Sequence, residues 1–364
     1  MVRREVDAMT RRHGRLALVT TLVALLTAGL AAPAAAGPPR GPKHFDIQAH
    51  RGGLGLTVEG TLAAFSRALE LGVTTLELDI QITRDGRDVI THDRQISAAK
   101  CRDTKPASPG DPQFPYVGSY VKDLTFAQVR TLDCGSLRQP GHPDQELAPG
   151  ATMPTLAELF DLVREHRAHR VRFNIETKVE AAAPEETAPR EQFVDRVIRE
   201  VSRSGFARNV TVQSFDWGAL MQVRRKAPWL PVVALTQPEF LQVGSPGRSP
   251  WLGGLDIDDF GGDPVAAVSS FGASALSPVH GNPQGGTVGD DDYVPFTTRE
   301  LVDDAHAAGL RVVPWTVNDR ATMHKLIDDG VDGLITDYPD RLREVAAERG
   351  FRPPKPSPLR GRDG

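Results

Sequence analysis

Cysteine is scarce in this chain of 364 residues, which contains Cys101 and Cys134 and no CxxC pair. The lack of that spacing argues against a structural zinc site, although a site built from the two cysteines and scattered histidines is an alternative. Both cysteines lie in the part of the chain that is expected to be exported, so we expect them to form a disulfide. In the chain-entropy model, such a bridge restricts the unfolded chain by about 3–4 kcal/mol.

The sequence also lacks an excess of positive charge. It holds 43 Lys and Arg against 47 Asp and Glu, and no stripe of basic residues is interleaved with aromatic ones. Removal of residues 1–36 takes away five basic and two acidic residues and leaves a net charge near −7. This charge disfavours nucleic acid as a partner. It also disfavours stable membrane association after that removal, since no amphipathic helix rich in Lys and Trp is evident.

The apolar run at residues 16–32 follows five arginines and precedes the small residues Ala34-Ala35-Ala36. This order is typical of a secretory signal, which we expect to span residues 1–36 and to direct the protein to the periplasm or the cell exterior. A membrane anchor is disfavoured because threonines interrupt the run and Pro33 ends it. The pair Arg11-Arg12 leaves both the general secretory route and the twin-arginine route open.

The rest of the chain is expected to form one domain, at residues 44–350, with a Pro-rich linker at 37–43 before it. The polar, Pro-rich residues 351–364 are expected to be a disordered tail. Within the domain, residues 94–150 are rich in Pro, Gly and Asp and contain both cysteines. So long a stretch with little regular pattern predicts an insertion, held by the disulfide.

From residue 155 onward, amphipathic helix patterns alternate with apolar strand patterns, and Gly205, Gly309 and Gly330 stand where left-handed helix caps are expected. This alternation predicts a parallel sheet covered by helices. At this length a closed (β/α)8 TIM barrel is favoured over an open sheet. Nine strand-like stretches can be counted, so one of them is expected to lie outside an eight-stranded ring.

Two carboxylates, Glu77 and Asp79, alternate with apolar residues in the period of a strand, so both project from the same face. The chain then turns at Asp85-Gly86 and returns through Val89-Ile90 to His92. Neighbouring carboxylates repel each other, and a bound cation would relieve the repulsion. The alternative is a solvated strand face with a histidine nearby by chance.

Other polar residues fall at the carboxyl ends of strand patterns, where a barrel of this kind carries its active site. Three of them, Asn174, Glu176 and Lys178, alternate along one strand and therefore share a face. The remaining ones are His50, Arg51, Gln213, Ser214, Trp315, Asn318, Thr336 and Asp337.

The types of these residues favour phosphodiester chemistry. Glu77, Asp79 and Glu176 would supply three hard oxygen ligands, which suit Ca²⁺ or Mg²⁺ rather than zinc. Fixed cations beside a metal favour a bound anion, and His50 and His92 could divide the proton transfers. The cations and the pocket residue that we expect to bind substrate and phosphate are Arg51, Lys178 and Trp315. In the plainer interpretation, Glu176 and Lys178 form only an ion pair and Trp315 belongs to the core.

Short motifs of the chain, taken in order, resemble the glycerophosphodiester phosphodiesterase family over about residues 45–345. The motifs are His50-Arg51-Gly52, Glu59, Glu77-Leu78-Asp79, Asp85-Gly86, His92-Asp93, Asn174 to Lys178, Ser214-Phe215, Trp315 to Asn318 and Thr336 to Pro339. The resemblance implies a (β/α)8 barrel, one divalent cation at Glu77, Asp79 and Glu176, and catalytic His50 and His92. It also implies hydrolysis of a small-molecule glycerophosphodiester to glycerol 3-phosphate and an alcohol. Glu59, Asn174 and Asn318 are expected to support the site.

The chain departs from the family pattern in two places. Val58-Glu59-Gly60-Thr61 keeps the acid of the usual Pro-Glu-Asn-Thr but loses the amide, so Glu59 could contact the metal or only brace the site. The residues usual after His92-Asp93 are replaced by the insertion, whose Phe114, Tyr116 and Tyr120 we expect to wall the pocket.

Ca²⁺ is favoured over Mg²⁺ as the cofactor because Ca²⁺ is abundant outside cells. Two other functions stay open at this point. One is a lyase that leaves a cyclic phosphate, and the other is a secreted binding protein without turnover.

Overall fold

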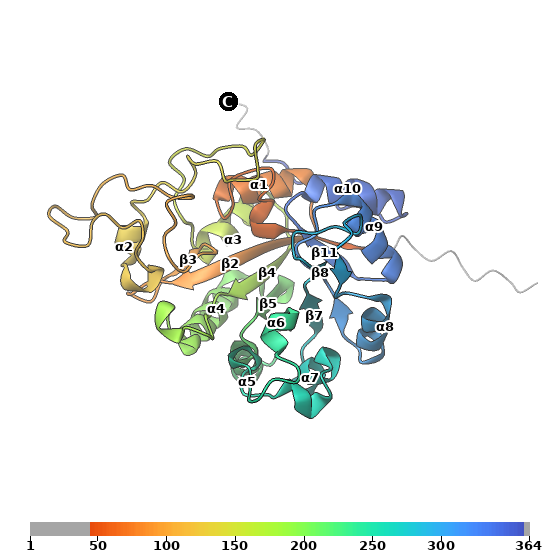
Figure 1. The fold of residues 1–364 in the computed structure, drawn as a ribbon. Coiled ribbons are helices and arrows are strands. Elements are labelled where there is room, and N and C mark those ends of the chain that lie inside the picture. The colour runs from red at the N-terminus through yellow and green to blue at the C-terminus, as the bar shows by residue number, and fades with distance from the viewer. Residues whose placement is uncertain (1–43, 360–364) are drawn as a thin grey trace, which may run out of the picture. The chain divides into compact units, whose positions relative to one another are not determined.

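A computed structural model describes residues 44–359, and within them eight parallel strands form a closed ring covered by helices (Figure 1). The strands are β1 (Asp46–Ala49), β2 (Thr75–Ile82), β4 (Arg172–Thr177), β5 (Val210–Ser214), β6 (Val232–Thr236), β7 (Ala275–Pro278), β10 (Arg311–Val312) and β11 (Gly333–Thr336). Neighbours pair in the order β10-β7-β6-β5-β4-β2-β1-β11. The ring closes because Asp332 N donates to Val312 O at 2.9 Å and Ile335 N to Pro314 O at 2.9 Å. The expected (β/α)8 barrel is confirmed.

Each barrel strand is followed by a helix on the outside of the ring. These helices are α1 (Leu62–Leu71), α3 (Leu156–Glu165), α4 (Arg190–Ser204), α5 (Trp217–Lys226), α7 (Pro264–Ser270), α8 (Arg299–Ala307), α9 (Arg320–Asp329) and α10 (Pro339–Glu348). The sequence patterns do not predict α7 and α10, which begin with the prolines Pro264 and Pro339. Proline is favoured at the first helical position because no intrahelical partner is lost there. No helix among residues 44–359 is long and apolar enough to cross a membrane.

Apart from the covering helices and several 3-10 turns, four further short elements lie outside the ring: α2 (Phe126–Val129), α6 (Pro238–Leu241), and the paired strands β8 (Gly281–Asn282) and β9 (Val294–Pro295). A fifth, β3 (Asp88–Ile90), pairs antiparallel with the end of β2, with Ile90 opposite Ile80. It is the peripheral ninth strand that the sequence predicts. Because the chain turns back here, Thr91 N donates to Asp79 O at 3.0 Å, and His92 returns to the level of Asp79.

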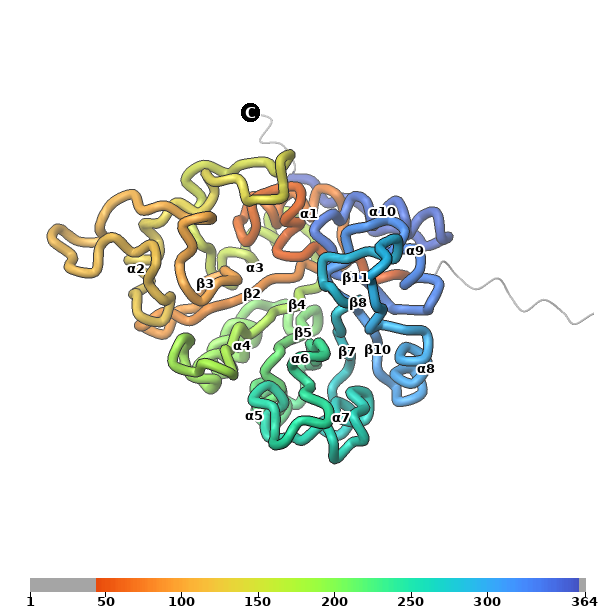
Figure 2. The backbone as a smooth tube through the Cα atoms, viewed as in Figure 1, coloured from red at the N-terminus to blue at the C-terminus, as the bar shows by residue number. Residues whose placement is uncertain are grey.

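The insertion at residues 94–150 forms a lobe beside β2 and β3 (Figure 2). It has a small hydrophobic core of its own, which contains Cys101, Cys134 and the fully buried Tyr116. Phe114 packs against this core, with its ring 5.3 Å from that of Tyr116. The expectation that Phe114 and Tyr116 wall the substrate pocket is therefore wrong, because both stabilise the insertion itself. Tyr120 does line the pocket.

The end of the described chain differs from the disordered tail expected from residue 351. Phe351 packs against Phe45, with ring centroids 5.0 Å apart, and Ser357 N donates to Leu69 O at 2.8 Å. Ser357 O lies 2.6 Å from Nδ1 of His166. An aromatic side chain and available backbone groups thus attach residues 351–357 to the barrel despite their prolines. The expected signal at 1–36, the linker at 37–43 and residues 360–364 lie outside the described residues.

Cys101 and Cys134 are joined by a disulfide, as expected. In the purified protein we predict that alkylation without reduction leaves both cysteines unmodified, and that alkylation after reduction adds two groups. Intact-mass spectrometry under denaturing conditions measures this directly. Two alkylated thiols before reduction would contradict the bridge.

Candidate active site

Three buried carboxylates cluster inside the barrel. Glu77 and Asp79 come from β2 and Glu176 from β4, where Glu176 is the register partner of Asp79. One oxygen from each residue lies within 4.8 Å of the others. The alternation of side chains along a strand explains why residues 77 and 79 both point inward. The set that the sequence predicts for a metal is thus brought together.

The pKa values of these acids indicate that three negative charges are costly here. Burial, and then the charge of Asp79, raise the pKa of Glu77 well above its usual value. Burial raises the pKa of Glu176 to about 7 although Lys178 opposes the change. For Asp79, burial is outweighed by Arg51, His92 and Lys178, so its pKa falls to about 2. A divalent cation would neutralise this cluster, and hard carboxylate oxygens are the donors that Ca²⁺ and Mg²⁺ prefer, so these residues fit such an ion.

Glu77 is held by hydrogen bonds to both of its carboxylate oxygens. Gln213 Nε2 donates to Oε1 at 2.6 Å, and the backbone N of Arg51 donates to Oε2 at 3.0 Å. Asn174 Nδ2 in turn donates to Gln213 Oε1 at 2.7 Å and to Gln48 Oε1 at 3.0 Å. Asn174 therefore supports the cluster through Gln213. The sequence did not predict the hydrogen bond between Gln213 and Glu77.

Two cations lie beside the carboxylates. Lys178 Nζ is 2.9 Å from Glu176 Oε1 and 3.9 Å from Asp79 Oδ1. Arg51 Nη1 donates to Glu59 Oε2 at 2.8 Å, while its buried Nε, 3.3 Å from Asp79 Oδ2, makes no hydrogen bond. Arg51 is thus paired with two carboxylates of the site, Glu59 and Asp79. Glu59 pairs with Arg51 and lies outside the three-carboxylate cluster.

His50 is oriented by a carboxylate from the last barrel strand. Ala49 and Thr336 are register partners on β1 and β11, so the residues that follow them, His50 and Asp337, leave the ring together. His50 Nδ1 lies 2.6 Å from Asp337 Oδ1. Asn318 Nδ2 donates to Asp337 Oδ2 at 2.7 Å, and Asp337 N donates to Asn318 Oδ1 at 2.9 Å. Burial would raise the pKa of Asp337, but His50 and then Asn318 outweigh it and lower this pKa.

His92 is likewise oriented by a carboxylate, that of Asp93. Its Nδ1 lies 2.8 Å from Asp93 Oδ1, and a third of its side chain is exposed. Burial, followed by the charges of Lys178 and Arg51, lowers the pKa of His92 well below its usual value. Both histidines thus use Nδ1 to bind a carboxylate, which leaves Nε2 as the other ring nitrogen able to take up or release a proton.

The three carboxylates, the two cations and the two histidines line one cavity of about 820 Å³, which also contacts the insertion and an aromatic wall. Arg94, Tyr120 and Glu186 form the side near the insertion, and Arg94 and Tyr120 both bond Glu186. Trp315 is 8% exposed and donates its Nε1–H to Ser277 O at 2.9 Å. It can therefore contact substrate only through its apolar ring, because its N–H is not available to donate a hydrogen bond to the phosphate. The rest of the aromatic wall is Phe215, Phe240 and Trp251.

Sequence reasoning placed Asp337 at a strand end but gave it no role. The available signal was its position after the last strand pattern, which in a closed barrel lies beside the first strand and hence beside His50. Asn318, predicted as a supporting residue, acts on Asp337.

Comparison with known proteins agrees with this geometry. The model of the glycerophosphoryl diester phosphodiesterase family matches residues 50–341. A glycerophosphodiester phosphodiesterase of Caldanaerobacter subterraneus subsp. tengcongensis is 28% identical over 304 residues, which cover 84% of this chain and 98% of that protein. A Bacillus subtilis protein of the same name is 27% identical over 308 residues, with coverage of 84% and 87%.

Solved structures show the same fold. A Silicibacter pomeroyi DSS-3 protein with the same family name superposes with a TM-score of 0.69 at 31% identity, covering 85% of this chain and 95% of that one. An Oleispira antarctica phosphodiesterase, solved with the product sn-glycerol-3-phosphate, has a TM-score of 0.58 at 20% identity and coverage of 82% and 96%. Enzymes of the family use a divalent metal, which Glu77, Asp79 and Glu176 could bind. The chain belongs to the glycerophosphoryl diester phosphodiesterase family and is an enzyme of that class.

Proposed function

We propose that the protein hydrolyses water-soluble glycerophosphodiesters to glycerol 3-phosphate and an alcohol, with one divalent cation at Glu77, Asp79 and Glu176. The observation that carries this proposal is the placement of three clustered carboxylates, two cations and two carboxylate-bonded histidines around one cavity. Ca²⁺ is proposed as the natural ion because the protein is proposed to be exported.

The residues of the chain divide the reaction as follows. Arg51 and Lys178 bind the anionic phosphodiester, and the cation would neutralise negative charge on its oxygens. Nε2 of one histidine takes a proton from the attacking water while the phosphorus–oxygen bond to the alcohol breaks. Nε2 of the other gives a proton to the departing oxygen. Asp337 and Asp93 keep Nδ1 of the two rings protonated and fix their orientation.

Product identification tests hydrolysis against the lyase alternative. Glycerophosphocholine incubated with the enzyme is expected to give a phosphomonoester signal in ³¹P NMR, because water is the nucleophile. A cyclic phosphodiester as the final product would favour the lyase, in which the neighbouring glycerol hydroxyl attacks instead. Tight binding of glycerophosphocholine without turnover would favour a binding protein.

We also propose that the protein acts in the periplasm or at the cell exterior. The support is the signal-like order of residues 1–36 together with the Cys101–Cys134 bridge, because disulfides persist in oxidising compartments.

Substrate size gives a further testable expectation. The cavity is enclosed on one side by Tyr120 and Arg94 of the insertion, and the chain is net negative, which disfavours docking on lipid surfaces. We expect glycerophosphocholine to be cleaved on the order of 10-fold or more faster than bis-p-nitrophenyl phosphate, which lacks the glycerol hydroxyls. We expect phosphatidylcholine in vesicles to be cleaved more slowly than glycerophosphocholine as well. Initial rates with one enzyme preparation measure this, and faster cleavage of the vesicle lipid would contradict it.

A further inference from the structure

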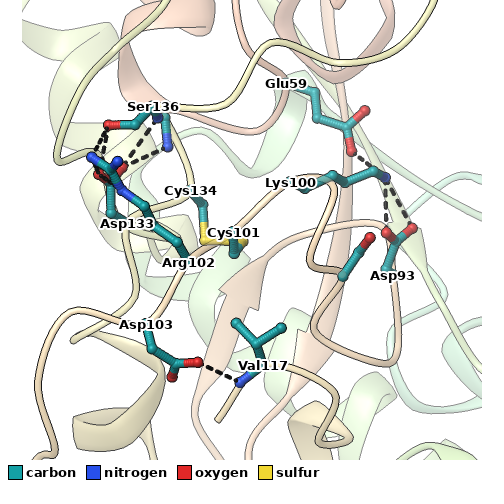
Figure 3. Close-up of a disulfide and its surroundings, with 12 residues drawn as sticks. Glu59, Asp93, Lys100, Cys101, Arg102, Asp103, Val117, Asp133, Cys134 and Ser136 are labelled. Carbon is teal, nitrogen blue, oxygen red and sulfur yellow. Dashed lines mark hydrogen bonds and ion pairs between the residues drawn. A yellow bond between two sulfur atoms is a disulfide. The ribbon is translucent and has the colours of Figure 1, made fainter. Parts of the chain in front are cut away.

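A chain of ion pairs connects the insertion to His92. Lys100 Nζ lies 2.8 Å from Glu59 Oε1 and 2.9 Å from Asp93 Oδ2 (Figure 3). Asp93 in turn bonds Nδ1 of His92, and Glu59 bonds Arg51. Lys100 is thus the one residue of the insertion that contacts carboxylates on both of these branches.

The support of Asp93 differs from that of Asp337. Asp337 is held by two hydrogen bonds with Asn318, which belongs to the barrel. Within residues 44–359, the ion pairs and hydrogen bonds of the Asp93 carboxylate go to His92 and Lys100 alone, and its side chain is 29% exposed. Without Lys100, the Asp93 carboxylate could rotate toward water and leave the His92 ring without a fixed partner.

The backbone at Lys100 is anchored on both sides. Before it, Ser97 O accepts hydrogen bonds from Lys100 N at 3.1 Å and from Cys101 N at 2.9 Å, which closes a turn that contains Lys100. After it, Cys101 is bonded to Cys134, and Arg102 exchanges two backbone hydrogen bonds with Asp133, at 2.9 and 3.1 Å. The Arg102 side chain points away from Lys100, toward Asp133 and Ser136 (Figure 3).

The charge of Lys100 also acts on Glu59. Burial would raise the pKa of Glu59, but Arg51 and then Lys100 outweigh it, so this pKa falls to about 2. Glu59 therefore stays ionised and offers Lys100 a permanent anchor. With one oxygen of Glu59 on Arg51 and the other on Lys100, the ammonium is held at a set distance from Asp93.

We infer that Lys100 is a positioning residue for His92: anchored by the Cys101–Cys134 bridge and Glu59, it fixes Asp93 and thereby the orientation of the His92 ring. The inference rests on the proposed function, because it assigns to Lys100 a part in the proton transfer made by His92. The insertion then helps to orient a catalytic side chain in addition to lining the cavity.

Three single variants of the full mature protein test it, with glycerophosphocholine as the substrate. Lys100→Met, which keeps the length of the chain and removes the charge, is expected to lower kcat by about 10- to 100-fold with little change in KM, the range found for groups that orient a catalytic ligand. Lys100→Arg, which restores a cation, is expected to recover most of this loss. Arg102→Met is the matched control, because it removes the cation on the other side of Cys101, and its kcat is expected to stay within about twofold. Equal losses in Lys100→Met and Arg102→Met would reduce Lys100 to a merely structural part of the insertion.

A double-mutant cycle identifies His92 as the group through which Lys100 acts. Lys100→Met introduced into His92→Ala is expected to cost less than about threefold, because the ring that Lys100 orients is already absent. The same change introduced into His50→Ala is expected to keep most of its effect. Full additivity with His92→Ala would overturn the inference.

A readout independent of turnover separates this inference from the proposed function. In the ¹H NMR spectrum, the Nδ1 proton of His92, assigned by its loss in His92→Ala, is expected to shift or broaden in Lys100→Met and to stay in place in Arg102→Met. If the wild type releases no glycerol 3-phosphate but this pattern holds, the proposed reaction fails and the positioning role stands. An unchanged His92 signal in Lys100→Met would overturn the positioning role whatever the activity.

Discussion

Replacement of Glu77, Asp79 or Glu176 by alanine is expected to lower kcat/KM for glycerophosphocholine by about 10³-fold or more. The reason is that the charge stabilisation given by a metal ion is worth several kcal/mol, and each 1.4 kcal/mol is a factor of ten. EDTA in excess should inhibit the wild type to a similar extent. The measurement is the release of phosphomonoester in metal-free buffer, followed by addition of Ca²⁺ or Mg²⁺ in separate samples.

Glu176→Gln is the control for folding. It keeps the shape of the side chain and removes a carboxylate whose pKa burial raises to about 7, so in EDTA it should melt no lower than the wild type. Full activity of the triple alanine variant in EDTA would rule out the metal site. Recovery with Mg²⁺ but not with Ca²⁺ would leave the site in place and correct the proposed ion.

The second large effect is expected at the histidines. His50→Ala and His92→Ala should each lower kcat by about 10²-fold or more, the usual contribution of a positioned acid or base. The wild type should show a bell-shaped dependence of kcat/KM on pH, because one ring must accept a proton and the other must donate one. Steady-state rates between pH 5 and 9 measure both effects.

A comparison of leaving groups tells the two histidines apart. The histidine that protonates the departing oxygen is needed less when that oxygen leaves easily, so its alanine variant should lose less activity on bis-p-nitrophenyl phosphate than on glycerophosphocholine. The other histidine should matter equally for both substrates. Near wild-type turnover of glycerophosphocholine by His92→Ala would show that His92 has neither role.

The parts of the site that lie on single strands could be predicted from the sequence. The period of two along β2 and β4 places Glu77, Asp79 and Glu176 inward, because alternate side chains share a face whatever the rest of the fold does. The helix start at Thr61 follows equally local rules, since its side chain accepts a hydrogen bond from Ala64 N.

Contacts that depend on strand order or on loop conformation could not be predicted in this way. The pair of His50 and Asp337 spans 287 positions and exists because β1 and β11 become neighbours when the ring closes. The contact of Gln213 with Glu77 spans 136 positions and also depends on that order. Lys100 lies in a segment without helix or strand, where composition gives no direction for a side chain.

The wrong prediction for Phe114 and Tyr116 of the insertion has a related explanation. A long segment with a disulfide needs a small core of its own to stay ordered, and Phe114 and Tyr116 supply it. Their hydrophobicity was evident from the sequence, but the choice between two apolar environments depends on the three-dimensional path of the chain.

The place where the insertion leaves the barrel bears on how such proteins can diverge. Within the described chain, residues 94–150 follow β3, which pairs only with β2 and lies outside the ring, so the insertion interrupts none of the eight barrel ladders. Doubling the length of a loop costs only about 0.6 kcal/mol in chain entropy. Selection can therefore lengthen or shorten the exposed parts of this segment at little cost to folding, provided that its core and the disulfide are kept. Changes near Arg94 and Tyr120 would alter the cavity rim, so substrate preference can evolve here while the carboxylates on β2 and β4 stay unchanged.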